Sequence, residues 1–184
     1  MKKEFVVGVT GASGVIYARR LLEVLCERAT VHIVISDTAR QIAGLEGVDL
    51  EGFDAIYAEN SDLAADIASG SFRYDGMAIV PCSMKTLAAV SNGFAENLIA
   101  RAADVCLKER RPLLLLLREM PLSRIHLKNM LAADNAGATV MVASPPFYQR
   151  PQTIDDLVDM VVARVLDHMG VEHNLGTRWS GYDA

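Results

Sequence analysis

The stretch VVGVTGASGVIYARRLLEVL, residues 6–25, decides the fold. An apolar run leads into a turn with three glycines, and a helical pattern of leucines and charged residues follows. A strand, a glycine turn and a helix in this order are typical of nucleotide-binding sites, because the turn lets backbone N–H groups approach a phosphate. The glycines at 8, 11 and 14 are spaced GxxGxxG, so the dinucleotide fingerprint GxGxxG is absent. Ser36 stands where a ribose-binding carboxylate is expected. A mononucleotide therefore fits better, and the neighbouring Asp37 keeps NAD as the alternative.

The same alternation of strand and helix continues along the chain. We expect strands at 4–9, 31–36, 76–82, 113–117 and 138–144, and helices at 14–28, from about 37, across 84–110, at 121–134 and at 154–169. The acidic segment 47–70 is expected to be a surface connection with one short helix near 63–68. The pattern predicts a single α/β domain over residues 1–184, with a mostly parallel sheet covered by helices on both faces.

Composition limits the possible partners. The chain has 184 residues, 51% of them hydrophobic, which suits one buried core. A net charge of -5 argues against nucleic acid and anionic membranes as partners, and favours small molecules or copies of the chain itself. Cys26, Cys82 and Cys106 have no CxxC or zinc-ligand spacing and leave one thiol over in any pairing. We expect reduced cysteines, no metal site, and a cytoplasmic protein without a targeting or membrane-spanning segment.

Two of the expected strand ends carry hydroxyl groups. TGASG brings Thr10 and Ser13, and PCSMKT (81–86) brings Ser83 and Thr86, each at the start of a helix. The carboxyl ends of parallel strands meet at one sheet edge, so the two ends can bind one phosphorylated ring compound. For the glycine turn alone, a tight turn closed by a serine cap is the alternative interpretation.

Four segments in this order resemble the UbiX-like flavin prenyltransferases, including those encoded beside aromatic-acid decarboxylases. The segments are GVTGASGVIYARRLL (8–22), the long stretch from GSFRYDGMAIVPCSMKT to LKERRPL (70–113), REMPLSRIHLKNML (118–131) and PPFYQRPQTIDDLVDMVVARVLDHMG (145–170). The resemblance implies a flavodoxin-like Rossmann fold and a homododecamer. It also implies transfer of a dimethylallyl group from dimethylallyl (mono)phosphate to N5 and C6 of reduced FMN. The product, prenylated FMN, would serve a partner UbiD-type decarboxylase.

The resemblance also implies site residues. The matching positions for FMN are Gly11, Ala12, Ser13, Ser36, Ser83, Met84, Lys85, Thr86, Arg101 and Arg118. Those for the dimethylallyl phosphate are Lys108, Arg118, Tyr148 and Arg164. The matching catalytic positions are Ser13, Glu46, Lys108, Arg118, Glu119 and Trp179.

The proposed phosphate residues suit the chemistry. A departing phosphate carries close to two negative charges and gains more as the allylic C–O bond breaks, so fixed cations stabilise it. Structural alternatives exist for each residue. Lys108 ends a charged helix, and Tyr148 can pack in a proline-rich turn. Arg164 can pair with Asp167 or Glu172.

Three further features have competing interpretations. Glu119 is either an ion-pair partner of Arg118 or a proton relay, and Trp179 is either loose or a cover over the prenyl pocket. The segment DDLVD (155–159) has the spacing of a magnesium-diphosphate motif, but Thr153 and the aspartates match a helix cap better. The competing functions are a flavin-dependent cysteine-type decarboxylase and a non-catalytic FMN-binding subunit of a decarboxylase complex.

Overall fold

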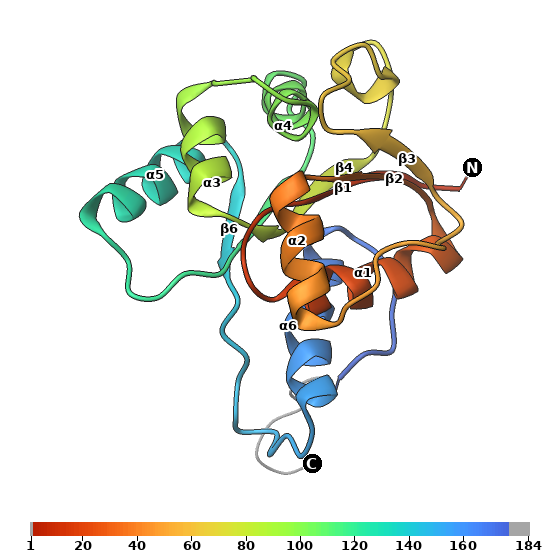
Figure 1. Cartoon of the computed structure of the whole chain (residues 1–184), viewed down its shortest axis with the longest axis vertical. Helices are drawn as coiled ribbons and strands as arrows, with labels where there is room; N and C mark the ends of the chain where they lie inside the picture. Colours follow the sequence, from red (N-terminus) through yellow and green to blue (C-terminus); the bar gives the residue numbers. More distant parts are fainter. Residues whose placement is uncertain (1, 177–184) are drawn as a thin grey trace.

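The computed structural model describes residues 2–176 and contains a sheet of parallel strands in the order β3-β2-β1-β4-β5-β6 (Figure 1). The strands are β1 (Glu4–Val9), β2 (Thr30–Ile35), β3 (Ile56–Glu59), β4 (Gly76–Cys82), β5 (Leu113–Leu117) and β6 (Thr139–Val142). The helices are α1 (Val15–Arg28), α2 (Asp37–Glu46), α3 (Met84–Asn92), α4 (Leu98–Lys108), α5 (Arg124–Asn135) and α6 (Ile154–His168). A 3₁₀ turn, η1, spans Asp66–Ala68. The expected α/β fold is confirmed.

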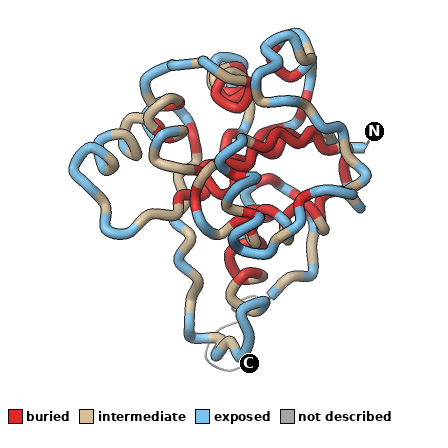
Figure 2. Tube along the Cα trace, viewed as in Figure 1, coloured by how far each residue is buried: buried red, intermediate tan, exposed pale blue. Residues whose placement is uncertain are grey.

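Each face of the sheet carries its own layer of helices. Helices α1, α2 and α6 pack in one apolar cluster with side chains such as Val7 and Leu116. Helices α3, α4 and α5 pack with η1 in a second cluster on the other face, with side chains such as Val6 and Leu115. Alternate residues of one strand thus enter opposite layers, as the pleat of a strand requires. Figure 2 shows the buried strands in the middle of the molecule and exposed chain around them.

The expectation for segment 47–70 was incomplete, because it contains the edge strand β3. This strand pairs in parallel with β2, from His32 opposite Ile56 to Ile35 opposite Glu59. It is short, and Ile56 and Tyr57 are 50% and 37% exposed, so it lacks the apolar pattern of a buried strand. The expected short helix near 63–68 corresponds to η1, which is a single turn.

The strand order reverses between β1 and β4. Chain connections run outward in opposite directions from these two neighbours, which opens a crevice at the carboxyl ends of the strands. Within residues 2–176, no helix combines the length and the apolar character needed to cross a membrane.

Candidate flavin site

A cavity of about 290 Å³ lies at the carboxyl ends of β1 and β4. Seven of the residues expected at the site line it: Gly11, Ser36, Ser83, Met84, Lys85, Thr86 and Glu119. Thr10, whose hydroxyl was expected to bind a phosphate, also lines it. Four more lining residues were not expected at the site: Thr38, Asn60, Asn97 and Ile99. The structure thus brings residues from both hydroxyl-rich strand ends to one cavity at the reversal of strand order.

The glycine turn is tightly packed against α2. A Cβ atom on Gly11 would lie 2.5 Å from Cγ2 of Thr38, so a larger residue there would displace this helix. Gly14 has a φ of 97°, a left-handed conformation that glycine adopts without strain, and it caps α1. Packing requires glycine at position 11 and backbone conformation favours it at position 14, whether or not a ligand is bound.

Thr10 holds the two strand ends together. Its side chain is buried, and its hydroxyl donates to the carbonyl oxygen of Pro81 at 2.9 Å. The Oγ1 atom of Thr10 in turn accepts from the Ser83 amide at 2.8 Å. The single hydroxyl proton of Thr10 is therefore in use, and the expectation that Thr10 donates to a phosphate is wrong. Among the described residues, the hydroxyl of Ser13 has no such partner.

Helices α2 and α3 begin at the cavity with unpaired backbone amides. Ser36 and Ser83 are their N-caps, and each hydroxyl oxygen accepts from the third helical amide, that of Ala39 or Thr86. The first two amides of each helix have no acceptor within the helix. Together with the positive end of the helix dipole they form a site for an anion.

Asn60 and Asn97, which were not expected at the site, cap the N-terminus of α4. Asn97 caps the amide of Ala100, while the backbone and side-chain oxygens of Asn60 accept from Leu98 and Ile99 at 2.8 and 3.1 Å. Asn60 directly follows the unexpected strand β3, which explains why it was missed. An Asn before a helical apolar pattern is a capping signal that could have identified Asn97.

Arg118 and Glu119 follow β5 but do not pair with each other within residues 2–176. Nε of Arg118 donates to the carbonyl oxygen of Ser13 at 3.1 Å, which ties the end of β5 to the glycine turn. A carboxylate oxygen of Glu119 accepts from the Met120 amide at 3.1 Å, and the side chain lines the cavity. The ion-pair interpretation of Glu119 is therefore not what the structure shows.

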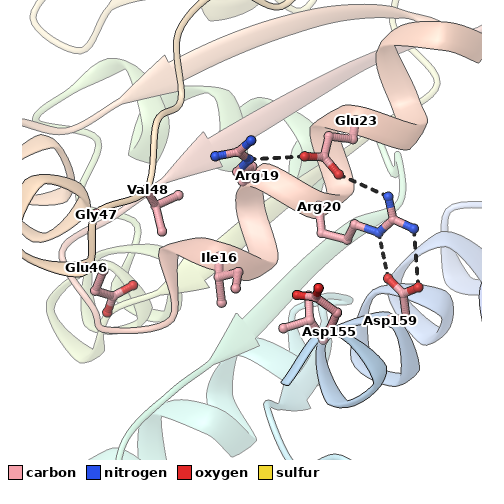
Figure 3. A pocket seen from close by; sticks show the side chains of 10 residues that line it. Ile16, Arg19, Arg20, Glu23, Glu46, Gly47, Val48, Asp155 and Asp159 are labelled. Carbon is pink, nitrogen blue, oxygen red and sulfur yellow. Dashed lines mark hydrogen bonds and ion pairs between the residues drawn. The ribbon is translucent and has the colours of Figure 1, made fainter. Parts of the chain in front are cut away.

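Glu46 lies beside a different and larger cavity, of about 540 Å³, between α1, α2 and α6 (Figure 3). Its carboxylate accepts from the amides of Gly14 and Val15 at 2.8 and 2.9 Å. It thus caps α1, whose own N-cap is a glycine without a side chain. Figure 3 also shows Arg20 between Glu23 and Asp159, with bonds of 3.0, 2.6 and 3.2 Å. The charges of Arg20, Glu23 and Asp159 are therefore already paired within the chain.

The four residues expected to bind the dimethylallyl phosphate do not meet within one chain. Lys108, at the end of α4, is paired with Glu109 and does not line the strand-end cavity. Tyr148 and Arg164 line a third cavity, of about 360 Å³, beside α6. Helices α4 and α6 cover opposite faces of the sheet (Figure 1).

Two more expected residues do not line the strand-end cavity. Arg101 donates to the carbonyl oxygen of Ala68 and to Asp104, at 3.1 and 2.9 Å. Ala12 is buried in the glycine turn. Trp179 lies outside the described residues.

The structural interpretation of DDLVD is confirmed. Thr153 and Asp156 form a capping box at the start of α6, and Asp159 is bonded to Arg20. The amides of Gln152 and Thr153 lower the pKa of Asp156. Among residues 2–176, no three His, Cys, Asp or Glu side chains are grouped as metal ligands would be.

Cys82 has the properties of a buried structural thiol. It is fully buried at the end of β4, and burial raises its pKa, so the nucleophilic thiolate is disfavoured. His126 has a local role, because its Nδ1 accepts from the Ser123 amide within a capping box.

The fold and the strand-end cavity define a nucleotide-binding protein of the Rossmann type. The Flavoprotein family model matches residues 1–166. The flavin prenyltransferase UbiX of Methanocaldococcus jannaschii is 47% identical over 180 residues, which cover 96% of this chain and 98% of the relative. The chain belongs to the UbiX-like flavin prenyltransferases.

Two solved structures agree with this assignment. The crystal structure of AnUbiX (PadA1) in complex with FMN and dimethylallyl pyrophosphate is 42% identical, with a TM-score of 0.95 and full coverage of both chains. A dodecameric FMN-dependent UbiX-like decarboxylase from Escherichia coli O157:H7 is 46% identical, with a TM-score of 0.92 over 97% of this chain and 100% of the other. The likeness therefore extends over the whole architecture.

Proposed function

We propose that this protein joins a dimethylallyl group, taken from dimethylallyl monophosphate, to N5 and C6 of reduced FMN and releases prenylated FMN. The observation that carries the proposal is the strand-end cavity, where α2 and α3 both begin with unpaired amides. These amides lie where a fold of this kind binds nucleotides, in a chain that matches a flavin prenyltransferase over 96% of its length, which supports the proposal.

The residues of the cavity fit FMN. Four helix amides and Lys85 supply donors and positive charge for the phosphate of FMN. The hydroxyl and amide side chains of the cavity can form hydrogen bonds with the polar chain and the ring edge of FMN. Glu119 is the only acidic side chain among the described lining residues, and the positive charge of Lys85 balances it. When bound and reduced, FMN supplies the nucleophilic nitrogen and carbon to which the prenyl group becomes attached.

Lys108, Arg118, Tyr148 and Arg164 are proposed to bind the departing phosphate. Arginine can donate to two phosphate oxygens at once, lysine acts as a point charge, and the tyrosine hydroxyl adds a neutral donor. Because these residues lie on different faces of one chain, we infer that neighbouring copies complete the site. A homododecamer is the proposed assembly, since the relative from Escherichia coli O157:H7 is dodecameric.

Glu119 is proposed to accept the proton that ring closure releases. Its side chain lines the cavity, and one carboxylate oxygen is held by the Met120 amide, which fixes the orientation of the other. Ser13 and Arg118, joined through the Ser13 carbonyl, are proposed to hold the edge of the flavin. Trp179 is proposed to exclude water from the allyl group.

The last two proposals concern the protein that receives the product and the cellular compartment. We propose that prenylated FMN passes to a UbiD-type decarboxylase and that the protein acts in the cytoplasm. Free Cys26, Cys82 and Cys106 support a reducing compartment.

The test is to incubate the purified protein anaerobically with reduced FMN and dimethylallyl monophosphate or diphosphate, and to measure the mass of the flavin afterwards. A flavin heavier by one prenyl group, formed without added metal, is the expected result. An unchanged flavin that stays bound would favour the carrier subunit. Decarboxylation of a peptidyl or pantothenoyl cysteine without any prenyl donor would favour the cysteine-type decarboxylase.

A further inference from the structure

Three side chains form a hydrogen-bonded series at the end of α6. Nη1 of Arg164 donates to Oδ2 of Asp167 at 2.9 Å, and the other carboxylate oxygen, Oδ1, lies 3.1 Å from Nε2 of His173. The exposed fraction falls along this series, from 60% for the Arg164 side chain to 21% for Asp167 and 2% for His173. A solvent-facing cation is thus connected to a buried imidazole.

The backbone decides which imidazole nitrogen carries the proton. The amide of Leu175 points at Nδ1 of His173, 3.2 Å away, so Nδ1 is the acceptor. Nε2 then carries the hydrogen in the neutral ring and donates it to Asp167. A neutral His173 therefore holds the carboxylate in place, and protonation is not needed.

We propose that Asp167 and His173 are positioning residues that hold Arg164 ready for the phosphate of the prenyl donor. This inference rests on the proposed function, in which Arg164 is a phosphate ligand. Asp167 occupies one donor of the guanidinium and leaves its other N–H groups for a ligand in the cavity shared with Tyr148.

The buried histidine makes this arrangement more than a surface ion pair. An exposed pair three residues apart on a helix contributes little by itself, because two mobile side chains must be ordered. Here the carboxylate is held by a ring that is buried and itself bonded to the backbone. Arg164 is then partly ordered in the free protein, so less conformational entropy is lost when the phosphate binds. This raises the affinity for the phosphate.

The experiment compares two substitutions of the full-length protein at one position. His173→Phe keeps the size of the ring but removes both hydrogen bonds, whereas His173→Gln keeps an N–H donor for Asp167. Calorimetry measures the Kd of dimethylallyl monophosphate, and of inorganic phosphate, with oxidised FMN bound so that no reaction occurs. The Kd of FMN and the Tm are recorded for each variant.

We expect His173→Phe to raise the Kd of dimethylallyl monophosphate by about three- to tenfold, the effect of releasing one long side chain. The Kd of FMN should stay unchanged, and His173→Gln should bind close to the wild type. Combining His173→Phe with Arg164→Ala should add nothing to the loss in Arg164→Ala alone, because the histidine acts through the arginine. If His173→Phe does not fold, Asp167→Asn tests the same step at a less buried side chain.

Other results would overturn the inference. These are an unchanged Kd in folded His173→Phe, a loss in the double variant equal to the sum of the single losses, or a wild type that binds neither phosphate compound. The proposed function fails separately: a wild type that binds dimethylallyl monophosphate with the expected dependence on His173, yet never prenylates reduced FMN, refutes the reaction and retains the positioning role.

Discussion

Replacing Glu46 by alanine tests whether its carboxylate is a helix cap. The substitution removes the acceptor for the Gly14 and Val15 amides, and Gly14 offers no side chain to replace it. Loss of an N-cap costs about 0.5–2 kcal/mol, and the negative charge at this end of the helix adds to the effect. With two amides uncapped, one of them partly buried, we expect a loss of about 1–2 kcal/mol. For a chain of this length that corresponds to a Tm lower by roughly 2–8 °C.

The assay combines calorimetry at one protein concentration with hydrogen exchange of the peptide that contains the first turn of α1. Glu46→Gln keeps one acceptor and should lose about half as much stability as the alanine variant. Glu27→Ala is the matched control. The Glu27 side chain is 74% exposed, and among the described residues its carboxylate pairs only with Arg28. Its effect should stay within about 0.5 kcal/mol. An unchanged Tm and unchanged exchange in Glu46→Ala, with activity abolished, would refute the cap and assign the carboxylate to the reaction.

Three further predictions concern the phosphate and the acidic helix start. Arg164→Ala should lose roughly 2–4 kcal/mol of transition-state stabilisation, measured as kcat/KM for the prenyl donor, with FMN affinity intact; an equal loss of FMN affinity would contradict it. Single-turnover prenylation should be unaffected by excess chelator and by the double substitution Asp155→Asn with Asp156→Asn; sensitivity to either would restore a metal site. The amides of Gln152 and Thr153 lower the pKa of Asp156, so its stabilising effect is complete above the ordinary Asp pKa and is lost as the pH falls below that value. Acid titrations of wild type and Asp156→Asn should therefore converge in stability at low pH, and parallel curves would disprove the coupling.

The sequence predicted the sheet wherever a strand is buried. The run of five leucines in β5 and the apolar run in β4 are fully buried, and such runs have few alternatives in an α/β chain. Strand β3 was missed because it lies at the sheet edge, where Ile56 and Tyr57 remain partly exposed. A four-residue strand of this kind is defined by its neighbour β2 rather than by its own pattern.

The part of the site that depends on strand order could be predicted from the sequence. Residues that directly follow β1 and β4 had to lie close together, because carboxyl ends of parallel strands share one edge. The contact of Glu46 with Gly14, 32 residues away in sequence, and that of Arg118 with Ser13, 105 residues away, depend on side-chain directions that no local pattern specifies. Thr10 shows the same limit, since a hydroxyl beside a glycine turn can serve a ligand or a neighbouring strand equally well.

The cations proposed to bind the phosphate have different partners within one chain. Lys108 and Arg164 are each paired with a carboxylate, of Glu109 and Asp167 respectively. Arg118 differs, because it donates to a carbonyl oxygen and has no carboxylate partner within residues 2–176. A carbonyl holds a guanidinium in place without cancelling its charge, so Arg118 keeps its attraction for an anion in the isolated chain. In the proposed assembly, Lys108 and Arg164 would reach the phosphate bound by Arg118, whereas in the isolated chain their carboxylate partners balance their charges.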